Sequence, residues 1–521
     1  MFGMSEVSAP TPRLRRDLWL LLILVLAASF RLQYVTAPLA DAHSWRQVTN
    51  ADIARNFAEQ SLNIFYPRVN WGGPSDAYVG MEFPLLQWLG GVAFLFADKP
   101  ELALRLITIV FSLITVVAVY GLGVRLFGVP AGRAAAFLMA ISPSAIFFGR
   151  AFISDTPMLC FSVLAVWAFA VYADTGSTRA LTWGTIAAAL ACLVKIPAVI
   201  LFAPVAMLGF QARRWRVLRD VRLVAGIAAA LMVTAAWYWH ADVLYHRTGL
   251  GQAIWHPSGT YGPEIAAASA SGQTISHWST LEQLGDGEFY REMVHRAWSL
   301  HLTPPGFALA LFAVMALRAR RRPVVLAWLA AAITFILASA EGQKHHEFHQ
   351  LPLLPPAVLL FGLAAAPAFD GAWLRARGGA AAIVLTPAAL VAVGVLAFQT
   401  SGVVPLLFRP THLNYRVIAA GKAINGSMPK EALLTTVDYP AIGANSPILL
   451  YHAHRRGWSF DGDSVTPHVL RQLRVHHGAR YFATLIWSEL GRKQPDLARY
   501  LETQKRIPLG LDDDVALFEL E

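Results

Sequence analysis

Eleven apolar runs, most of them close to the length needed to cross a bilayer, occupy residues 18–399 of this 521-residue sequence. A transmembrane helix needs about 20 apolar residues because the hydrocarbon core is about 30 Å thick. Only 15% of the residues are charged, whereas soluble domains have about 25%. We therefore predict an all-α polytopic membrane protein with about 11 transmembrane helices. The runs are near residues 18–35, 102–124, 132–149, 156–173, 180–194, 196–210, 222–241, 302–317, 323–340, 351–368 and 379–399.

The arginines between these runs predict the orientation of the chain. Cytoplasmic loops of membrane proteins are enriched in Lys and Arg. If the N-terminus is cytoplasmic and the short apolar stretch 83–97 does not cross, every arginine-rich short loop falls on the cytoplasmic side. The net charge of +10 is then a signal of topology and not of nucleic-acid binding. The arginines concerned are Arg125, Arg133, Arg179, Arg213, Arg214, Arg216, Arg219, Arg222, Arg318, Arg320, Arg321, Arg322, Arg375 and Arg377.

Two further features complete the predicted topology. The first run is too long for the core of a cleavable signal peptide, so we expect it to remain as a span. The stretch 180–210 has to cross twice, with a break at Lys195-Ile196-Pro197, or the arginines that follow would lie outside. Three more arginines precede the first run: Arg13, Arg15 and Arg16. The outer face then receives residues 38–101, 150–155, 242–300, 341–350 and the C-terminal segment.

The composition of the chain changes near residue 402. Residues 1–401 hold the spans and the juxtamembrane helices, whereas residues 402–521 have the composition of a soluble domain. Apolar β-like runs at 432–437, 479–485 and 515–518 alternate with helical stretches, a pattern typical of α/β structure. We predict a small C-terminal α/β domain on the outer, periplasmic side.

The first polar cluster that the spans do not explain follows the first run. Asp41, His43 and Arg46 combine a carboxylate, an imidazole and a guanidinium. Ionisable groups next to hydrocarbon are costly unless they have a partner or a function, so this cluster is a candidate site. The alternative is a polar loop in which Asp41 pairs with Arg46. After it, residues 52–60 resemble an amphipathic helix lying on the membrane.

Two acidic residues lie at the starts of predicted helices on the same face. Glu82 precedes Pro84, and Asp155 follows Arg150 between the third and fourth runs. An acid or a proline at a helix N-terminus also complements the helix dipole and its free N–H groups. Helix capping is therefore the alternative explanation for both acids.

A histidine-rich segment precedes the run at 351–368. Lysine neutralises a phosphate as a point charge, and histidine donates to it or binds a metal. Lys195 adds a cation at the break between the fifth and sixth runs, where a buried ammonium requires an anionic partner. The alternative for the segment is a solvated polar loop. Its ionisable residues are Lys344, His345, His346, Glu347 and His349.

Together these clusters predict carboxylates and cations around one outer-face cavity. A substrate with a phosphate and an apolar tail fits this set, together with a hydroxyl acceptor that needs a base. One alternative is a transporter or lipid flippase, which would carry ionisable groups at mid-membrane and broken helices in paired halves. Another is an O-antigen ligase or polymerase, in which the essential residues concentrate in a large late loop.

The ordered set of clusters resembles the GT-C superfamily of membrane glycosyltransferases that use polyprenyl-phosphate sugars. The resemblance covers about residues 15–370 and is clearest for the branch with protein O-mannosyltransferases, the lipid A aminoarabinose transferase and the RgtA/B/C/D-like enzymes. The sequence departs from many relatives at Ala42, where a second acid is common, and at Glu82, where several carry Lys or His. The matching elements are Asp41, Glu82-Phe83-Pro84-Leu85, Arg150 with Asp155, Lys195-Ile196-Pro197-Ala198 and Phe348 to Pro355.

The resemblance implies an inverting hexosyl- or pentosyltransferase on the outer face of the inner membrane. It would move a sugar from a polyprenyl (undecaprenyl) phosphate to a hydroxyl of lipopolysaccharide, another envelope glycan or a protein. Asp41 would be the general base, and Asp155 and Glu82 would position the acceptor or the sugar. The candidates to hold a possible divalent cation, Mg²⁺ or Mn²⁺, are Asp41, His43 and Asp155. The candidates to bind the substrate and the departing phosphate are His43, Arg46, Arg150, Lys195, Lys344, His345, His346 and His349.

Overall fold

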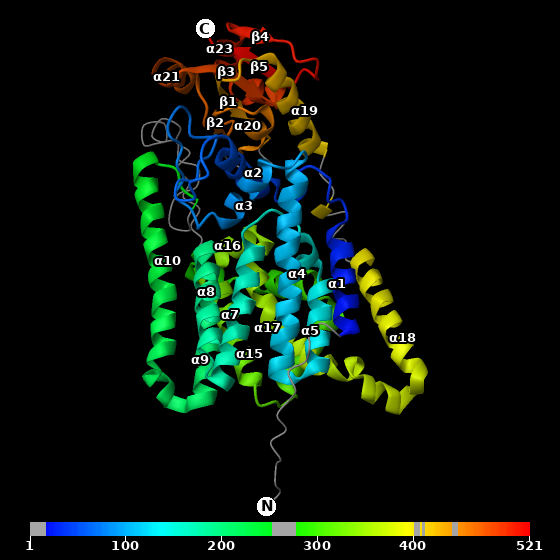
Figure 1. Cartoon of the computed structure of the whole chain (residues 1–521). Helices are drawn as coiled ribbons and strands as arrows, with labels where there is room; N and C mark the ends of the chain where they lie inside the picture. The colour runs from blue at the N-terminus through cyan, green and yellow to red at the C-terminus, as the bar shows by residue number, and fades with distance from the viewer. Residues whose placement is uncertain (1–16, 253–277, 401–406, 409–411, 440–445) are drawn as a thin grey trace, which may run out of the picture.

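The computed structural model of the chain contains a bundle of long helices and, at the end where the C-terminus lies, a small sheet with its own helices (Figure 1). It describes residues 17–252, 278–400, 407–408, 412–439 and 446–521. The arginines at positions 13, 15 and 16 and the middle of the predicted outer loop 242–300 lie outside these residues.

Each of the eleven apolar runs coincides with one helix of the bundle or with two or three consecutive helices. Within the described ranges, five helices are long and apolar enough to cross a bilayer, or six if one bent pair forms a single span. The larger number of spans therefore stays a prediction. The helices are α1 (Leu18–Arg31), α4 (Pro100–Phe127), α5 (Val129–Ile141) with α6 (Pro143–Phe148), α7 (Asp155–Thr175), α8 (Thr178–Val194), η2 (Ile196–Leu201) with α9 (Phe202–Arg213), α10 (Val221–Thr248), α14 (Pro304–Met315), α15 (Arg322–Ala338), η5 (Glu347–Leu353) with α17 (Leu354–Ala365) and η6 (Ala366–Phe369), and α18 (Gly371–Thr400).

The predicted break at Lys195 is present. Lys195 has an extended backbone, with φ −163° and ψ 125°, between the end of α8 and the start of η2. Pro197 lies at the start of η2, and a proline disfavours helical backbone at the residue before it. The stretch 180–210 is accordingly divided into two helices.

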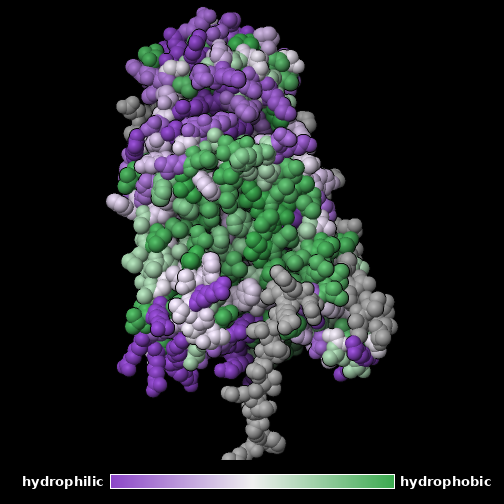
Figure 2. Space-filling view, in the orientation of Figure 1, coloured by the Kyte–Doolittle hydropathy of each residue, from purple (hydrophilic) through white to green (hydrophobic). Residues whose placement is uncertain are grey.

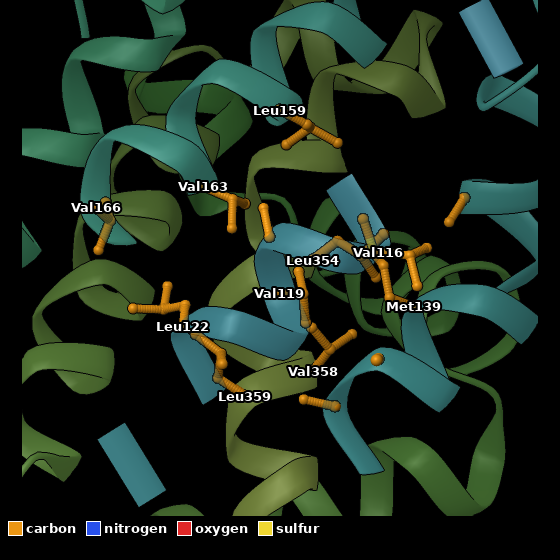
Figure 3. Packing of buried hydrophobic residues seen from close by; sticks show 14 of the residues in the cluster. Val116, Val119, Leu122, Met139, Leu159, Val163, Val166, Leu354, Val358 and Leu359 are labelled. Carbon is orange, nitrogen blue, oxygen red and sulfur yellow. The ribbon is translucent and has the colours of Figure 1, made fainter. Parts of the chain in front are cut away.

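The core of the bundle is built from α4, α5, α7 and α17 (Figure 3). Val116 and Val119 of α4 recur at helical spacing and are fully buried, as is Val358 of α17. Helices in a bilayer associate through close packing, which small residues allow. A Cβ added at Gly123 of α4 would lie 2.8 Å from the Cα of Gly132 in α5, so glycine is required where these two backbones approach.

The arginine loops meet at the end of the bundle away from the sheet. Arg125 and Arg321 both pair with Asp174, the first at 2.7 Å, and Arg213 pairs with Asp220 at 3.2 Å. Figure 2 shows hydrophilic side chains at this end and at the opposite end, with a belt of apolar side chains between them. Arginines from three of the loops that the sequence assigns to one side of the membrane thus lie at the same end of the bundle.

Two helices of the first outer loop lie between the bundle and the sheet (Figure 1). α3 (Leu85–Phe94) has 10 residues and is about 15 Å long, so it is too short to cross, as predicted. α2 (Ser44–Glu59) differs from the expected amphipathic surface helix: it is buried on nearly all sides from Ser44 to Phe57. The reason is that α3 packs against it and α20 (Ile448–Ala453) of the C-terminal part packs on it as well.

The C-terminal part contains a five-stranded mixed sheet in the order β2-β1-β3-β5-β4. The three runs expected from the sequence match β1 (Leu433–Val437), β3 (Ala479–Thr484) and β5 (Ala516–Glu519). The sequence pattern missed β2 (Gly457–Phe460) and β4 (Lys505–Ile507), which have only four and three residues. β2, β1 and β3 are parallel, whereas β3, β5 and β4 are antiparallel. The predicted boundary at residue 402 lies outside the described residues.

The remaining described helices connect the elements already named. In the bundle they are η3 (Arg214–Arg219), α12 (Leu281–Gly285), α13 (Gly287–Arg296), η4 (Ala297–His301) and α16 (Ala340–His345). In the C-terminal part they are α19 (His412–Ser427), α21 (Pro467–His477), α22 (Trp487–Lys493) and α23 (Pro495–Glu502).

Arg55 of α2 fixes the C-terminal part to the first outer loop. Its Nη1 donates to the backbone oxygen of Tyr451 at 2.8 Å, and its guanidinium carbon lies 3.8 Å from the centroid of the Tyr451 ring. Backbone hydrogen bonds add a second contact, because Gly457 N donates to Asn70 O and Gly73 N donates to Gly457 O, both at 2.9 Å.

We predict that Arg55→Ala weakens this docking by about 2 kcal/mol, because it removes a buried charged hydrogen bond and a cation–π contact. Hydrogen exchange of the α20 and β2 amides in the full chain would measure the effect. Arg471→Ala is the control, since the Arg471 guanidinium lies over the Tyr500 ring on an exposed surface at 5.7 Å. Equal exchange in the two variants would contradict the role of Arg55.

Candidate active site

Most of the predicted site residues lie at the end of the bundle that faces the sheet, in two groups. We call the first group the Asp41 clamp; it consists of Asp41, Gln47, Arg105 and Arg150. We call the second group the Lys195 cluster; it consists of His43, Arg46, Asp155, Lys195, His346, Glu347 and Phe348.

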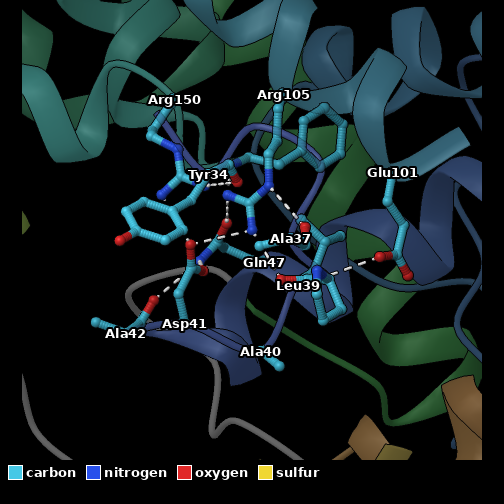
Figure 4. Close-up of polar contacts among 12 residues, drawn as sticks. Tyr34, Ala37, Leu39, Ala40, Asp41, Ala42, Gln47, Glu101, Arg105 and Arg150 are labelled. Atoms are coloured by element: carbon cyan, nitrogen blue, oxygen red, sulfur yellow. Dashed lines mark hydrogen bonds and ion pairs between the residues drawn. The ribbon is translucent and has the colours of Figure 1, made fainter. Parts of the chain in front are cut away.

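The Asp41 clamp is a buried carboxylate held by two arginines (Figure 4). The Oδ2 atom of Asp41 is 3.0 Å from Arg105 Nη2 and 3.0 Å from Arg150 Nη1, and the three side chains are 0% exposed. Gln47 Nε2 donates to Asp41 Oδ1 at 2.6 Å. Charges without contact with water are costly unless they are paired and hydrogen-bonded. The carboxylate therefore has all its strong interactions inside the protein.

The two arginines also bind the loop that carries Asp41. Arg105 donates to the backbone oxygens of Ala37 and Pro38, and Arg150 donates to that of Tyr34 at 2.9 Å. These contacts order the chain between α1 and α2, which has no regular secondary structure of its own over residues 38–43. The position of Asp41 is thus determined by side chains of α4 and of the loop before α7.

Arg105 and Gln47 are missing from the sequence-based site. The signal for Arg105 was an arginine inside an apolar run, which needs a partner or a function. The alternative pairing of Asp41 with Arg46 is wrong for this structure, because the Arg46 guanidinium lies over the Trp45 ring at 5.2 Å. Asp41 instead pairs with Arg105 and Arg150, which are far from it in the sequence.

A segment before the C-terminal part lies over the Asp41 loop. Ala42 N donates to Leu407 O at 3.0 Å, and Asn414 Nδ2 donates to Ala40 O at 2.5 Å. The buried Phe408 ring lies 4.4 Å from the guanidinium carbon of Arg150. The Asp41 clamp is therefore covered from the side of the C-terminal part.

The Lys195 cluster is centred on an ion pair at the break between α8 and η2. Lys195 Nζ is 2.7 Å from both carboxylate oxygens of Asp155, the first residue of α7. Asp155 is thus the anionic partner expected for this lysine, and its carboxylate binds an ammonium. Lys195 Nζ also lies 4.9 Å from the centroid of the Phe348 ring.

His43 forms a second pair in the same cluster. Its Nε2 is 2.9 Å from Glu347 Oε2, and the two side chains are 16% and 31% exposed. The His43 ring packs edge-on against Phe348 at 5.1 Å. His43 has a left-handed backbone, with φ 55°, at the N-cap of α2. This turn directs the chain from the buried Asp41 clamp into the partly exposed Lys195 cluster.

His346 is a neutral member of the cluster. Burial and the charges of Arg46, His43 and Lys195 together lower the pKa of its imidazole to about 3. Its ring stacks on Phe348 at 4.9 Å, and its buried Nδ1 has no hydrogen-bond partner among the described residues. A neutral imidazole can donate or accept one hydrogen bond but brings no fixed charge, so Arg46 and Lys195 are the permanent cations here.

Three predicted residues of the histidine-rich segment lie at the edge of the cluster or outside it. Lys344 Nζ is 3.6 Å from Asp286 Oδ2, and both side chains are more than one-third exposed. His345 pairs with Glu341 at 3.1 Å and is mostly exposed. The His349 ring is 5.4 Å from that of His346. Lys344 and His345 are thus solvated, as the alternative expected, but they lie in the last turn of α16 and not in a loop, while His346 belongs to the interior.

Glu82 lies on another side of the break at Lys195. The neighbouring Phe83 packs against Trp237, Leu193 and Ile196, and Phe83 N donates to Leu193 O at 2.9 Å. The N-cap of α3 is Pro84, which makes no side-chain capping hydrogen bond. Glu82 is half-buried beside the same break that positions Lys195.

The three residues expected as metal ligands do not form one cation site. Asp41 is bound by two arginines, Asp155 by Lys195, and His43 by Glu347. Across the part of the chain that is described, no group of three or more His, Cys, Asp or Glu side chains could hold a metal ion. A divalent cation at these carboxylates would have to displace their basic partners.

Comparisons with known proteins reveal the fold family. Residues 82–239 match the family described as dolichyl-phosphate-mannose-protein mannosyltransferase. The structure is similar to crystal structures of ArnT from Cupriavidus metallidurans in the apo state and bound to undecaprenyl phosphate, each with a TM-score of 0.66 and 13% sequence identity. This similarity covers 96% of this chain and 97% of ArnT. The chain therefore shares the fold of these structures over nearly its whole length.

Two more solved structures extend the comparison. The Archaeoglobus fulgidus oligosaccharyltransferase has a TM-score of 0.54 at 14% identity, with 93% of this chain and 71% of that chain covered. The arabinofuranosyltransferase AftD from Mycobacteria has a TM-score of 0.50 at 13% identity, with 96% and 40% covered. A search of curated proteins found no match to the sequence.

The family match covers only part of the candidate site. It includes Glu82, Arg150, Asp155 and Lys195, but not Asp41. The fold similarity, in contrast, extends over nearly the whole chain, including the C-terminal part.

We predict that Arg105→Met lowers the free energy of unfolding by about 3–5 kcal/mol, because it breaks a fully buried ion pair. Arg125→Met is the matched control, since the Arg125–Asp174 pair is partly exposed and is worth less than about 1 kcal/mol. Unfolding of the full chain in nanodiscs would compare the two. Equal losses would show that the Asp41 clamp does not stabilise the fold.

Proposed function

We propose that the chain is an inverting glycosyltransferase that moves a sugar from a polyprenyl phosphate to a hydroxyl acceptor on the outer face of the inner membrane. The observation that carries this proposal is the Lys195 cluster, where cations, a neutral histidine and carboxylates lie at the ends of apolar helices. A lipid phosphate meets the hydrocarbon at this depth. The arginine loops at the other end of the bundle support the orientation.

Lys195 and Arg46 are suited to the departing phosphate. When the acceptor oxygen attacks the anomeric carbon, the bond from that carbon to the phosphate oxygen breaks and negative charge grows on the phosphate. Fixed cations contribute most where charge develops. ArnT was crystallised with undecaprenyl phosphate, which supports this class of donor. His346 Nδ1 adds a hydrogen-bonding group whose capacity is unused within the described residues.

Two groups are candidates for the base that takes the acceptor proton. Asp41 is the base that the GT-C resemblance implies, and it would have to exchange one of its three donors for the acceptor hydroxyl. The His43–Glu347 pair is the second candidate, because a carboxylate orients the imidazole and both groups are partly exposed. We keep Asp41 as the proposed base and assign His43 to orient the acceptor.

To reach Asp41 from the side of the C-terminal part, the acceptor has to displace the contacts of Leu407 and Asn414 with the Asp41 loop. Lipopolysaccharide, another envelope glycan and a protein all offer a hydroxyl that would serve. The lipid or glycan that is lost on deletion of the gene, identified by mass spectrometry, names the acceptor and provides the assay for variants.

When the Asp41→Asn variant is expressed in the deletion strain, the lost product is not expected to reappear. Removal of the base should lower the transfer rate by about 10²–10⁴-fold. His43→Gln is expected to have a smaller effect. Glu288→Gln is the matched carboxyl-to-amide control, because Glu288 is exposed and pairs only with Arg291 among the residues described. Near-normal turnover of Asp41→Asn together with loss in His43→Gln would transfer the role of base to His43.

Lys195→Met is expected to weaken binding of undecaprenyl phosphate by at least about tenfold, because it removes a charge-assisted contact with the phosphate. Thermal stabilisation of the full chain by added undecaprenyl phosphate would measure this binding. EDTA is expected to leave it unchanged, since the charge comes from Lys195 and Arg46. Loss of binding in EDTA alone would assign the charge to a divalent cation.

A further inference from the structure

A cavity of about 250 Å³ lies where the first outer loop, the end of α10 and the sheet meet. No residue of the Asp41 clamp or the Lys195 cluster lines it. We propose that this cavity binds one saccharide ring of a carbohydrate acceptor. That the ring belongs to an acceptor rests on the proposed glycosyltransferase function. The lining residues that carry the argument are Trp71, Thr248, Leu250, Trp458 and His477.

The two tryptophans supply the chemistry that a sugar requires. A sugar ring presents C–H groups on its faces and hydroxyls at its edge, and an indole offers an apolar face with a single N–H donor. Trp71 is 3% exposed, and its Nε1 has no hydrogen-bond partner among the described residues. A buried donor without an acceptor costs about 1–3 kcal/mol. A ligand hydroxyl or ring oxygen at Trp71 Nε1 would remove this cost.

The cavity walls are already positioned without a ligand. Gly73 has a left-handed backbone, with φ 62°, and a Cβ there would lie 2.5 Å from Cζ2 of Trp458. The loop is held on the edge strand β2 by the hydrogen bonds between Gly73, Gly457 and Asn70. Thr248 Oγ1 donates to Tyr78 O at 2.6 Å, which fixes the end of α10. A preformed site loses little freedom on binding.

The charge and size of the cavity favour a neutral ring. The described residues that line it include no Asp, Glu, Lys or Arg, and nearby Arg456 donates to the backbone oxygens of Gly73 and Ser75. A phosphate or carboxylate would find no dedicated cation. The volume is slightly below the range of about 300–1,000 Å³ typical of drug-sized ligands, so one sugar ring fits better than a peptide or a polyprenyl chain.

The position of the cavity links acceptor binding to the site. Trp71 and Glu82 belong to the same loop, and Trp237 Nε1 donates to Met81 O at 3.1 Å just before Glu82. Trp458 belongs to β2 of the C-terminal sheet. A sugar ring between Trp71 and Trp458 would contact both the first outer loop and the C-terminal part. The C-terminal part would then take part in acceptor recognition.

Saturation-transfer NMR on the full chain in nanodiscs tests the proposal, with methyl α-mannopyranoside and methyl β-glucopyranoside as probes. Maltoside detergents are avoided because they carry sugar rings. The wild-type chain is expected to bind at least one probe, and Trp71→Phe is expected to weaken binding by about tenfold because it removes the N–H donor. Trp487→Phe is the matched control, since Trp487 packs on Phe518 at 5.0 Å outside the cavity.

A second variant distinguishes loss of sugar binding from loss of folding. Leu250→Phe fills the cavity without removing a polar group and is expected to abolish binding while the unfolding temperature stays near that of the wild type. Absence of binding to the wild type, equal binding by Trp71→Phe, or competition by inorganic phosphate would each overturn the proposal. The assay contains no lipid donor, so failure of the glycosyltransferase proposal would leave sugar binding intact but without transfer.

Discussion

The burial of Asp41 between Arg105 and Arg150 is the interaction on which the arrangement of the outer end depends. It joins the loop after α1, the start of α4 and the loop before α7, and all three side chains are inaccessible to water. Loss of one partner would leave an unpaired charge in the interior. The arginines also bind backbone oxygens of residues 34–38. The same interaction therefore orders the loop that leads into α2, the helix on which the C-terminal part packs.

Charge is separated between the two ends of the bundle. One end gathers arginines in pairs with Asp174 and Asp220, and the other holds the Asp41 clamp and the Lys195 cluster. An apolar belt separates them (Figure 2). In the proposed function, the arginines at one end specify orientation in the membrane, and the cations at the other end bind the lipid phosphate.

The outer end is itself divided into two regions with different chemistry. The Lys195 cluster carries permanent cations beside carboxylates, which suits a phosphate, whereas the tryptophan-lined cavity has no Asp, Glu, Lys or Arg among its described lining residues. Arg55 and the backbone contacts at Gly73 hold the C-terminal part against the first outer loop. In the proposed function, these regions correspond to donor and acceptor.

Hydrophobic periodicity and arginine placement by themselves determined the helices, the break at Lys195 and the common end of the arginine loops, because these properties depend on neighbouring residues. The sequence also named Asp41, Asp155 and Lys195 as site residues. Only the tertiary structure decided which charges meet: Asp41 with Arg105 and Arg150, and Asp155 with Lys195. It also made His346 neutral by burial. These ion pairs join residues far apart in the chain, and no local sequence pattern encodes the helix packing that brings the partners together.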